Sequence, residues 1–346
     1  AKEINNRLDE IRAMALNIYM EQSAVRDGVT AEEVKGILLG MASGQETLLG
    51  YFRRFIRNFE KRVGINRTVG SLRAYSNAYS HIERFLQAQY KLSDIPFSAL
   101  DRSFIDKYDL YLRTERNLAP GTIINLTVQL KTIVGEAIAD GVITASPFMG
   151  YEPVRPKHVQ KYLTAEELHR IMTTPLHRQT LYHVRDMFLF SCFTGIPYGD
   201  MRLLTKDNLC LAEDGIWWIK SARQKTKIEF EIPLLDLPLQ ILKKYSGTAP
   251  GDKLLPMYCN STLNLYLKEI ARICHIDRPL VFHAGRHTYA TEITLSHGVP
   301  LETVSRMLGH SQIETTQIYA KVTDEKIDTD TKALNRKISE RFSVVI

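Results

Sequence analysis

The stretch "LGHSQIETTQIYAKV", residues 308–322, places His310 nine residues before Tyr319. On one continuous helix nine residues turn through roughly 900°, which would put the two side chains on opposite faces. However, Gly309 is a typical helix stop, and the S-x-x-E pattern of a capping box begins at Ser311. We therefore expect a helix to end at Gly309 and a second helix to begin near Ser311, with Tyr319 about two turns into it. His310 would then lie in the corner between the helices, where both side chains can face one target.

Two basic groups lie upstream of this corner. The stretch "HAGRHTYAT" begins at His283 and places Arg286 on the same helix face, because residues three apart are neighbours. The run "ARQKTK" contains Arg223 and Lys225 between two segments that read as strands. Four or five donors, most of them cationic, that face one hydroxyl suggest a phosphate pocket with a nucleophile.

Before residue 146 the apolar residues recur at helical spacing. "TLLGYFRRFIRNFEKRVG" is the clearest example, with aromatic residues along one face and arginines between them. We expect four helices here: Thr47 to Gly64, a second with Ser71 as a possible cap, Ser103 to Arg116, and Pro120 to Gly141. Such a set predicts a small helical bundle, preceded by a helical segment over residues 1–45.

Residues 146–162 have a different character, with three prolines and no periodic apolar face. Arg155, Lys157 and Lys161 give this segment a positive charge. It is typical of an extended linker, and we expect these three side chains to contact the backbone of a nucleic acid.

The remainder, 163–346, is again helical in pattern, with a capping box at Thr164 and one β insert. Residues 216–220 and the alternating run around Phe230 predict two antiparallel strands. A long helix should end at Gly298, and a short one should follow over 300–308.

Composition sets the outer limits. Hydrophobic residues make up 44% and charged residues 24%, which is ordinary for a globular protein. No apolar run reaches about 18 residues and no signal peptide is visible, so we expect a cytoplasmic protein without a membrane span. The net charge of +6 and pI near 9.0 favour a polyanionic partner. The four cysteines are scattered and show no metal-ligand spacing.

The ordered combination of a lysine hairpin, "HAGRHTYAT" and "LGHSQIETTQIYA" resembles the tyrosine recombinase (phage-type integrase) family over nearly the whole chain. The stretches "QKTKIEFEIPL" and "FTGIPYGDM" are similar to integrases of conjugative transposons and related mobile elements. The resemblance implies a mainly α fold: a core-binding helical domain over 46–145, the basic linker over 146–162, and an α-helical catalytic domain with a small antiparallel sheet and a C-terminal tail over 163–346.

In this resemblance Tyr319 is the nucleophile that attacks a DNA phosphodiester and forms a 3′-phosphotyrosine. A tyrosine with a reference pKa near 10 is a poor nucleophile at neutral pH, so a base and a cationic pocket are required. His283 matches the family's base, Arg286 and His310 match the groups that hold the nonbridging oxygens, and Lys225 matches the lysine that protonates the leaving 5′ oxygen. The resemblance implies no metal and no cofactor.

One position departs from the family pattern. "TGIPYGDM" places Pro197 where the family usually has a phosphate-binding arginine. Arg223 is our first choice as its substitute, because an i, i+2 relation on an extended strand would aim it along the same face as Lys225. Arg202 is the second candidate.

The resemblance also implies partners: double-stranded DNA recombination sites held in a C-shaped clamp, a homo-tetramer in the synapse, and accessory DNA-bending or directionality factors. Because the chain begins at Ala1 without a methionine, we expect it to be a fragment of a longer protein, and the resemblance implies that an arm-site DNA-binding domain precedes it. The apolar end "FSVVI" is expected to dock on a neighbour or on its own domain. Two alternatives stay open, a catalytically weak accessory protein that only binds DNA and an enzyme like a type IB topoisomerase.

Overall fold

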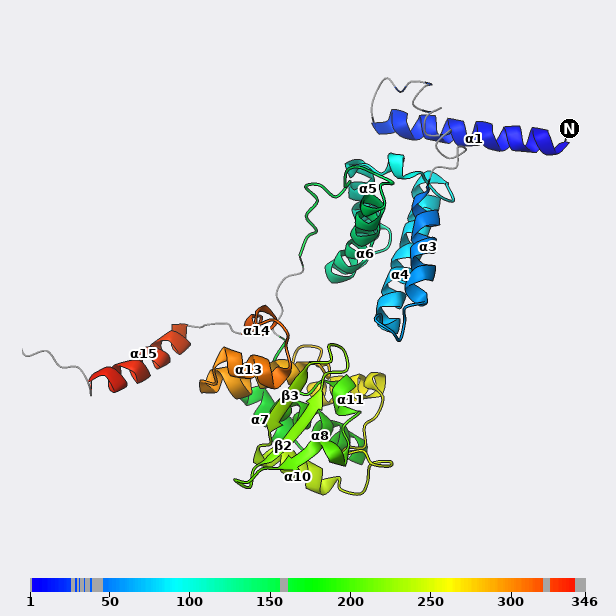
Figure 1. Ribbon diagram of the computed structural model, residues 1–346. Helices are drawn as coiled ribbons and strands as arrows, with labels where there is room; N and C mark the ends of the chain where they lie inside the picture. Colours follow the sequence, from blue (N-terminus) through cyan, green and yellow to red (C-terminus); the bar gives the residue numbers. More distant parts are fainter. Residues whose placement is uncertain are drawn as a thin grey trace, which may run out of the picture. The chain divides into compact units, whose positions relative to one another are not determined.

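The computed structural model describes residues 2–25, 46–155, 161–319 and 324–339, together with Val29, Ala31, Val34 and Leu38. The chain divides into two compact units, residues 1–158 and residues 159–346, which we call the N-terminal and C-terminal units (Figure 1). The predicted linker residue Lys157 and the C-terminal "FSVVI" lie outside the described residues. Over the described residues no helix is long and apolar enough to cross a membrane.

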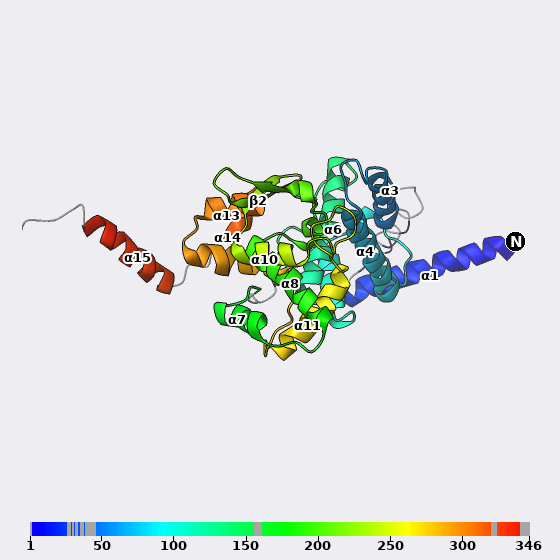
Figure 2. The ribbon, with the colours of Figure 1, turned by 90° about the horizontal axis from the view of Figure 1, so that it is seen from below.

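The N-terminal unit is helical, as expected. Helices α3, α4, α5 and α6 pack as a bundle around a core rich in aromatic rings, in which Phe52, Phe85 and Tyr108 are fully buried (Figures 1 and 2). The elements are α1 (Lys2–Val25), α3 (Leu48–Glu60), α4 (Val69–Phe85), the π-helix η1 (Leu86–Tyr90), the 3₁₀-helix η2 (Phe97–Ala99), α5 (Arg102–Thr114) and α6 (Pro120–Ala139).

Side-chain caps set the starts of two of these helices. The hydroxyl of Thr68 accepts a hydrogen bond from the backbone N–H of Ser71, so Thr68, and not Ser71, caps α4. The carboxylate of Asp101 accepts from the N–H of Phe104 at 2.7 Å and caps α5. Both caps lie two or three residues before the predicted positions, Ser71 and Ser103, because the capping side chain precedes the first helical turn.

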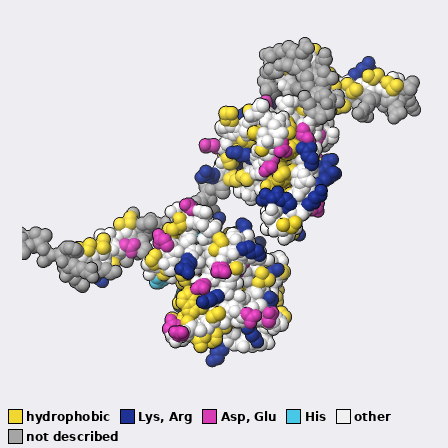
Figure 3. Space-filling model, in the orientation of Figure 1, with side chains coloured by type: hydrophobic (Ala, Val, Ile, Leu, Met, Phe, Trp, Pro, Cys, Tyr) yellow, Lys and Arg dark blue, Asp and Glu magenta, His cyan; other side chains and the backbone are white. Residues whose placement is uncertain are grey.

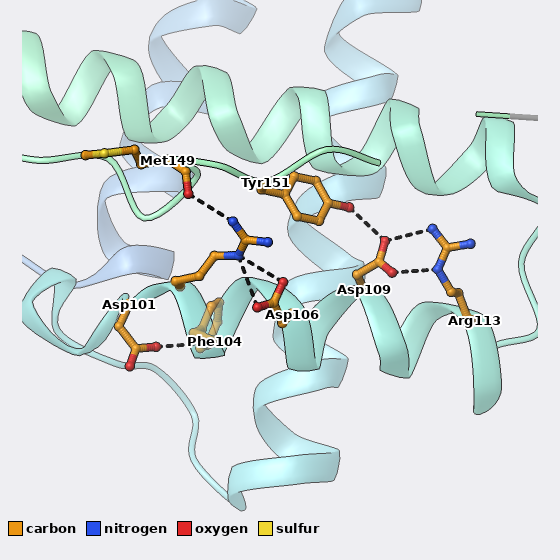
Figure 4. A network of polar contacts seen from close by, with 8 residues as sticks. Asp101, Phe104, Asp106, Asp109, Arg113, Met149 and Tyr151 are labelled. Atoms are coloured by element: carbon orange, nitrogen blue, oxygen red, sulfur yellow. Dashed lines mark hydrogen bonds and ion pairs between the residues drawn. The ribbon is translucent and has the colours of Figure 1, made fainter. Parts of the chain in front are cut away.

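A polar network fixes the segment after α6 onto α5 (Figure 4). The guanidinium of Arg102 donates to the carbonyl of Met149 at 2.9 Å and pairs with Asp106. The hydroxyl of Tyr151 donates to Asp109 at 2.7 Å, and Asp109 also pairs with Arg113. The chain is therefore anchored to the bundle as far as Tyr151, a few residues before the division between the units.

The C-terminal unit is mainly helical with one small antiparallel sheet, which confirms the expected fold class. Its elements are α7 (Ala165–Thr173), α8 (Gln179–Thr194), α9 (Tyr198–Met201), η3 (Lys206–Asn208), β1 (Leu209–Leu211), β2 (Trp217–Ala222), β3 (Glu229–Pro233), α10 (Asp236–Lys244), α11 (Asn260–Ile273), α12 (Ala284–Thr288), the π-helix η4 (Tyr289–Thr294), the 3₁₀-helix η5 (Leu295–His297), α13 (Leu301–Leu308), α14 (Glu314–Gln317) and α15 (Asp324–Ser339).

The sheet has the order β1-β2-β3, with Ile219 opposite Ile232 in the β2–β3 register. Both residues are buried, so the alternating apolar face points into the core as predicted. Strand β1 was not expected, because three residues are too few to show a period. The predicted capping box at Thr164 is present and opens α7.

The long helix expected to end at Gly298 is instead three consecutive pieces, α12, η4 and η5. The hydroxyl of Thr294 donates to the carbonyls of Tyr289 and Ala290, inside the π-helical turn. Such side-chain bonds compete with the regular backbone ladder. Gly298 does end the run, with a positive φ of 82°.

Candidate active site

A cavity of about 830 Å³ opens in the C-terminal unit. Its walls come from the β2–β3 turn, the start of α12, the corner after α13 and the segment around α14. The side chains that line it and bear on the chemistry are Lys161, Arg223, Lys225, His283, Arg286, His287, His310 and Tyr319. The structure thus brings together all six predicted catalytic residues in one cavity.

Arg286 lines this cavity and is 3% exposed. Its guanidinium donates to the carbonyl of Gly195, which follows α8, at 2.9 Å, and to the carbonyl of Leu308, the last residue of α13, at 2.6 Å. The partial negative charge of two helix C-termini favours a cation at this position. Burial and the nearby Arg223 lower the pKa of Arg286 to about 10, so the side chain remains charged at neutral pH.

Two glycines allow the backbone to turn close to Arg286. Gly195 has φ of +69°, and a Cβ there would meet the Tyr289 ring at 2.5 Å. Gly309 has φ of +63°, and a Cβ there would meet the Arg223 side chain at 2.9 Å. Any other residue would be strained and crowded at either place, so both helix ends depend on glycine.

Arg223 reaches the same point as Arg286. It also donates to the carbonyl of Leu308, at 2.9 Å, and its Nε lies 2.6 Å from a carboxylate oxygen of Asp200. The other Asp200 oxygen accepts from the N–H of Gln224, which fixes the turn. Two guanidiniums that bond one carbonyl oxygen lie within reach of one phosphate group.

The strand argument that selected Arg223 was nevertheless wrong. Strand β2 ends at Ala222, so Arg223 and Lys225 belong to a turn and not to an extended strand. Tertiary contacts, and not strand alternation, direct Arg223 into the cavity. The alternative candidate, Arg202, is exposed at the end of α9 and is absent from the residues that line the cavity.

His310 lies in the corner after Gly309, as predicted. Its Nε2 is 2.8 Å from a guanidinium nitrogen of Arg286, and its Nδ1 is 2.8 Å from the hydroxyl of Thr316. Burial, then the charges of Arg286 and Arg223, lower its pKa to about 4. The ring is therefore neutral at neutral pH.

Tyr319 is 6% exposed and stacks against His310, with ring centroids 6.1 Å apart. A hydrogen bond to Tyr319 is among the factors that favour the charged form of Arg286. The predicted helix was wrong in length: α14 spans only Glu314–Gln317, and Tyr319 lies beyond its end. The predicted capping box was also wrong, because Ile313 occupies the N-cap and makes no side-chain cap.

His283, the N-cap of α12, and His287, inside α12, bring two more imidazole rings to the cavity. His283 is exposed, and its ring centroid is 5.0 Å from that of His287. The His287 ring is in turn 5.0 Å from the ring of Tyr319. Burial, followed by nearby positive groups, lowers the pKa of both histidines, that of His287 to about 4. No role was predicted for His287, yet its ring contacts that of Tyr319.

Lys225, predicted to protonate the leaving 5′ oxygen, is exposed and lines the cavity. The predicted DNA contacts fall in different places. Lys161, predicted as a linker residue, also lines the cavity, whereas Arg155 is exposed in the N-terminal unit. Among the described residues, no three His, Cys, Asp or Glu side chains come together as metal ligands would.

Sequence reasoning missed three residues of this site: Asp200, His287 and Thr316. Each contacts a residue that was recognised, namely Arg223, Tyr319 and His310, respectively. The only signal in the sequence was proximity to residues already singled out: Asp200 follows Pro197 by three residues, and Thr316 precedes Tyr319 by three. A buried tyrosine beside two guanidiniums and neutral imidazoles defines a class of site that can bind a phosphate group next to a hydroxyl.

Comparisons with known proteins agree with this class. The Phage integrase family matches residues 161–326, and the Phage integrase SAM-like domain matches residues 47–153. Tyrosine recombinase XerD of Listeria monocytogenes is 25% identical over 273 residues, which cover 74% of this chain and 89% of that protein. Tyrosine recombinase XerD of Staphylococcus saprophyticus is 26% identical over 297 residues, which cover 82% and 96%.

Solved structures share the fold at lower identity. The Tn1549 transposon integrase in complex with transposon right end DNA has a TM-score of 0.65 at 18% identity, covering 84% of this chain and 99% of that one. A lambda integrase tetramer bound to a Holliday junction has a TM-score of 0.67 at 16% identity, covering 89% and 87%. The chain belongs to the phage integrase family, the tyrosine-type site-specific recombinases.

Proposed function

We propose that this recombinase cuts and rejoins DNA strands through a covalent bond between Tyr319 and a 3′ phosphate. The observation that carries the proposal is that Tyr319 shares one cavity with Arg286, Arg223, His310 and Lys225. Those neighbours supply what an attack on a phosphodiester requires: donors for the charged oxygens and a proton source for the leaving group.

The reaction is a transfer of one phosphoryl bond. The Tyr319 oxygen forms a bond to phosphorus and loses its proton, and the bond from phosphorus to the 5′ oxygen breaks. His283 and His287 are neutral at neutral pH, since the pKa of each lies below its ordinary value. They are the nearby groups able to take the tyrosine proton, directly or through water. Lys225 gives a proton to the leaving 5′ oxygen. Reversal with another 5′ hydroxyl rejoins the strands.

The phosphate charge is balanced by two guanidiniums. Arg286 stays fixed by the carbonyls of Gly195 and Leu308, and Arg223 stays fixed by Asp200. Because these donors are positioned before the phosphate arrives, little reorganisation accompanies the growth of negative charge. In this arrangement Arg223 takes the role of the arginine that Pro197 replaces.

DNA contact is proposed for both units. On the N-terminal unit, Lys and Arg side chains gather along α3 and the turn that follows it (Figure 3). The exposed arginines of these two elements include Arg53, Arg57 and Arg62. On the C-terminal unit, Lys161 and Lys225 are exposed at the cavity. Positive side chains of this kind bind phosphates without regard to sequence.

The finer parts of the proposal rest on similar proteins. We propose double-stranded recombination sites as the substrate and a homo-tetramer as the synaptic assembly, since a lambda integrase tetramer of similar fold binds a Holliday junction. We propose integration and excision of a mobile element as the role, since the Tn1549 integrase of similar fold binds transposon end DNA. Accessory DNA-bending or directionality factors would act beside this chain.

A suicide substrate tests the function. The substrate is an oligonucleotide duplex with a nick a few nucleotides 3′ of the cleavage point. After attack, the short fragment that bears the new 5′ hydroxyl dissociates, so the strands cannot be rejoined and the covalent adduct accumulates. We expect the wild-type chain to form an adduct that survives denaturing electrophoresis, and Tyr319→Phe to form none while it still binds DNA. No adduct from the wild-type chain on its element's own sites would favour the accessory protein. Relaxation of supercoiled DNA by a monomer would favour the topoisomerase-like enzyme.

A further inference from the structure

Thr316 connects the two parts of the active site. Its side chain is fully buried, and its hydroxyl lies 2.8 Å from Nδ1 of His310. Its backbone carbonyl accepts the N–H of Tyr319 at 2.9 Å. One residue therefore contacts the imidazole that bonds Arg286 and the backbone that carries the nucleophile.

The contacts of His310 define its tautomer. A guanidinium has only donors, so the Arg286 nitrogen 2.8 Å from Nε2 requires Nε2 to be the acceptor. The ring proton then lies on Nδ1 and is donated to the hydroxyl of Thr316. Each ring nitrogen has one partner of the correct kind, and Thr316 supplies the partner that the ring proton needs.

We propose that Thr316 is a positioning residue for strand cleavage: its hydroxyl holds the ring of His310 and the proton on Nδ1 while its carbonyl holds the Tyr319 backbone. This inference rests on the proposed function of Tyr319. Without the hydroxyl, the partly buried Nδ1–H would lose its acceptor in the protein, and such an orphan group is costly enough to displace the ring. Displacement would disturb Arg286 and the ring that stacks on Tyr319.

A hydroxyl suits this position for a second reason, because it can donate as well as accept. When a phosphate takes over the donors of Arg286, His310 can present an Nε2–H to a phosphate oxygen. The ring then gives its Nδ1 proton to water and takes another proton from water at Nε2, so its charge is unchanged. The Thr316 hydroxyl donates to the bare Nδ1 and remains a partner in both states.

Nuclear magnetic resonance tests the inference without any cleavage. Two-bond proton–nitrogen correlation on the full chain, with ¹⁵N-labelled histidine, distinguishes the two neutral tautomers. We expect His310 of the DNA-free wild-type chain to give the Nδ1–H pattern, and Thr316→Ser to keep it. Thr316→Val should lose it. The matched control is Thr294→Val, which removes another buried hydroxyl that bonds only to carbonyls of its own turn.

Cleavage of the suicide substrate gives the second readout. We expect Thr316→Val to slow adduct formation by about 10- to 100-fold, the usual effect of losing a partner that orients a reacting group. Thr316→Ser should stay within about threefold of wild type by the same reasoning. An Nε2–H tautomer in the wild-type chain, or cleavage by Thr316→Val at the wild-type rate, would overturn the inference.

The two readouts separate this inference from the function on which it rests. If the wild-type chain forms no adduct but His310 has the Nδ1–H tautomer, which Thr316→Val abolishes, the proposed function fails and the positioning contact stands. If Thr316→Val does not fold, Thr316→Ser and the wild-type spectrum still decide the question.

Discussion

Replacing Arg223 by alanine tests how the chain compensates for Pro197. In the proposed transition state the phosphate gains about one negative charge. A unit charge about 4 Å away contributes about 4 kcal/mol at an effective dielectric constant of about 20. Loss of one fixed donor from an enzyme that stabilises an oxyanion costs a similar amount, about 2.7–4 kcal/mol. Since about 1.4 kcal/mol is tenfold in rate, Arg223→Ala should slow cleavage by on the order of 10²- to 10³-fold.

The assay is single-turnover adduct formation on the suicide substrate, with DNA affinity measured in parallel. Affinity should stay nearly unchanged, because Arg223 is only one of the cations proposed to contact DNA. Arg202→Ala is the control, since Arg202 is exposed and does not line the cavity. It should cleave close to the wild-type rate.

A neutral substrate distinguishes lost charge from damaged structure. A methylphosphonate at the cleavage point replaces one nonbridging oxygen by a methyl group, which removes the negative charge that Arg223 is proposed to balance. The defect of Arg223→Ala should therefore be at least about tenfold smaller on methylphosphonate than on phosphate, by the charge argument above. Equal defects on both substrates, or a larger defect for Arg202→Ala, would refute the reasoning.

Two further expectations concern salt and acid. Replacing Arg155, Lys157 and Lys161 by alanine should reduce the slope of the logarithm of the DNA-binding constant against the logarithm of salt concentration, by about 0.9 per lost phosphate contact. Sequence preference should not change. An unchanged slope would place the linker away from DNA. The pKa of His310 lies near 4 in the fold and at 6.5 ordinarily, so the unfolded chain takes up the proton first. The neutral His310 ring therefore contributes to the free energy of unfolding fully above pH 6.5, and this contribution is lost as pH falls toward 4. His310→Gln should therefore show a smaller drop in unfolding free energy between pH 7 and pH 5, measured in urea, and an equal drop would contradict the assignment.

Much of the site was predictable because its signals are local. The positive φ that Gly309 adopts stops α13 and creates the corner that holds His310. The i, i+3 spacing of His283 and Arg286 brings both to the cavity. Apolar spacing likewise predicted the helical N-terminal unit. Apolar residues at helical spacing indicate a helix with one buried face, whichever elements pack against that face.

The remaining features depend on contacts between distant segments. Arg223 reaches the cavity through Asp200 and Leu308, neither of which is its sequence neighbour. The position of Tyr319 does not depend on a long helix, because the rings of His310 and His287, from other elements, contact its ring. Local patterns carry no information on such pairings. Strand alternation and the capping box were therefore wrong reasons for placing together residues that do line one cavity.

The most direct test of the central claim is to identify the atom that holds the DNA. The adduct from a suicide substrate can be digested with protease and nuclease and sequenced by mass spectrometry. We predict one modified peptide, with the phosphate on Tyr319 and the nucleotide attached through its 3′ oxygen. A phosphate on any other residue, or attachment through the 5′ oxygen, would contradict the account.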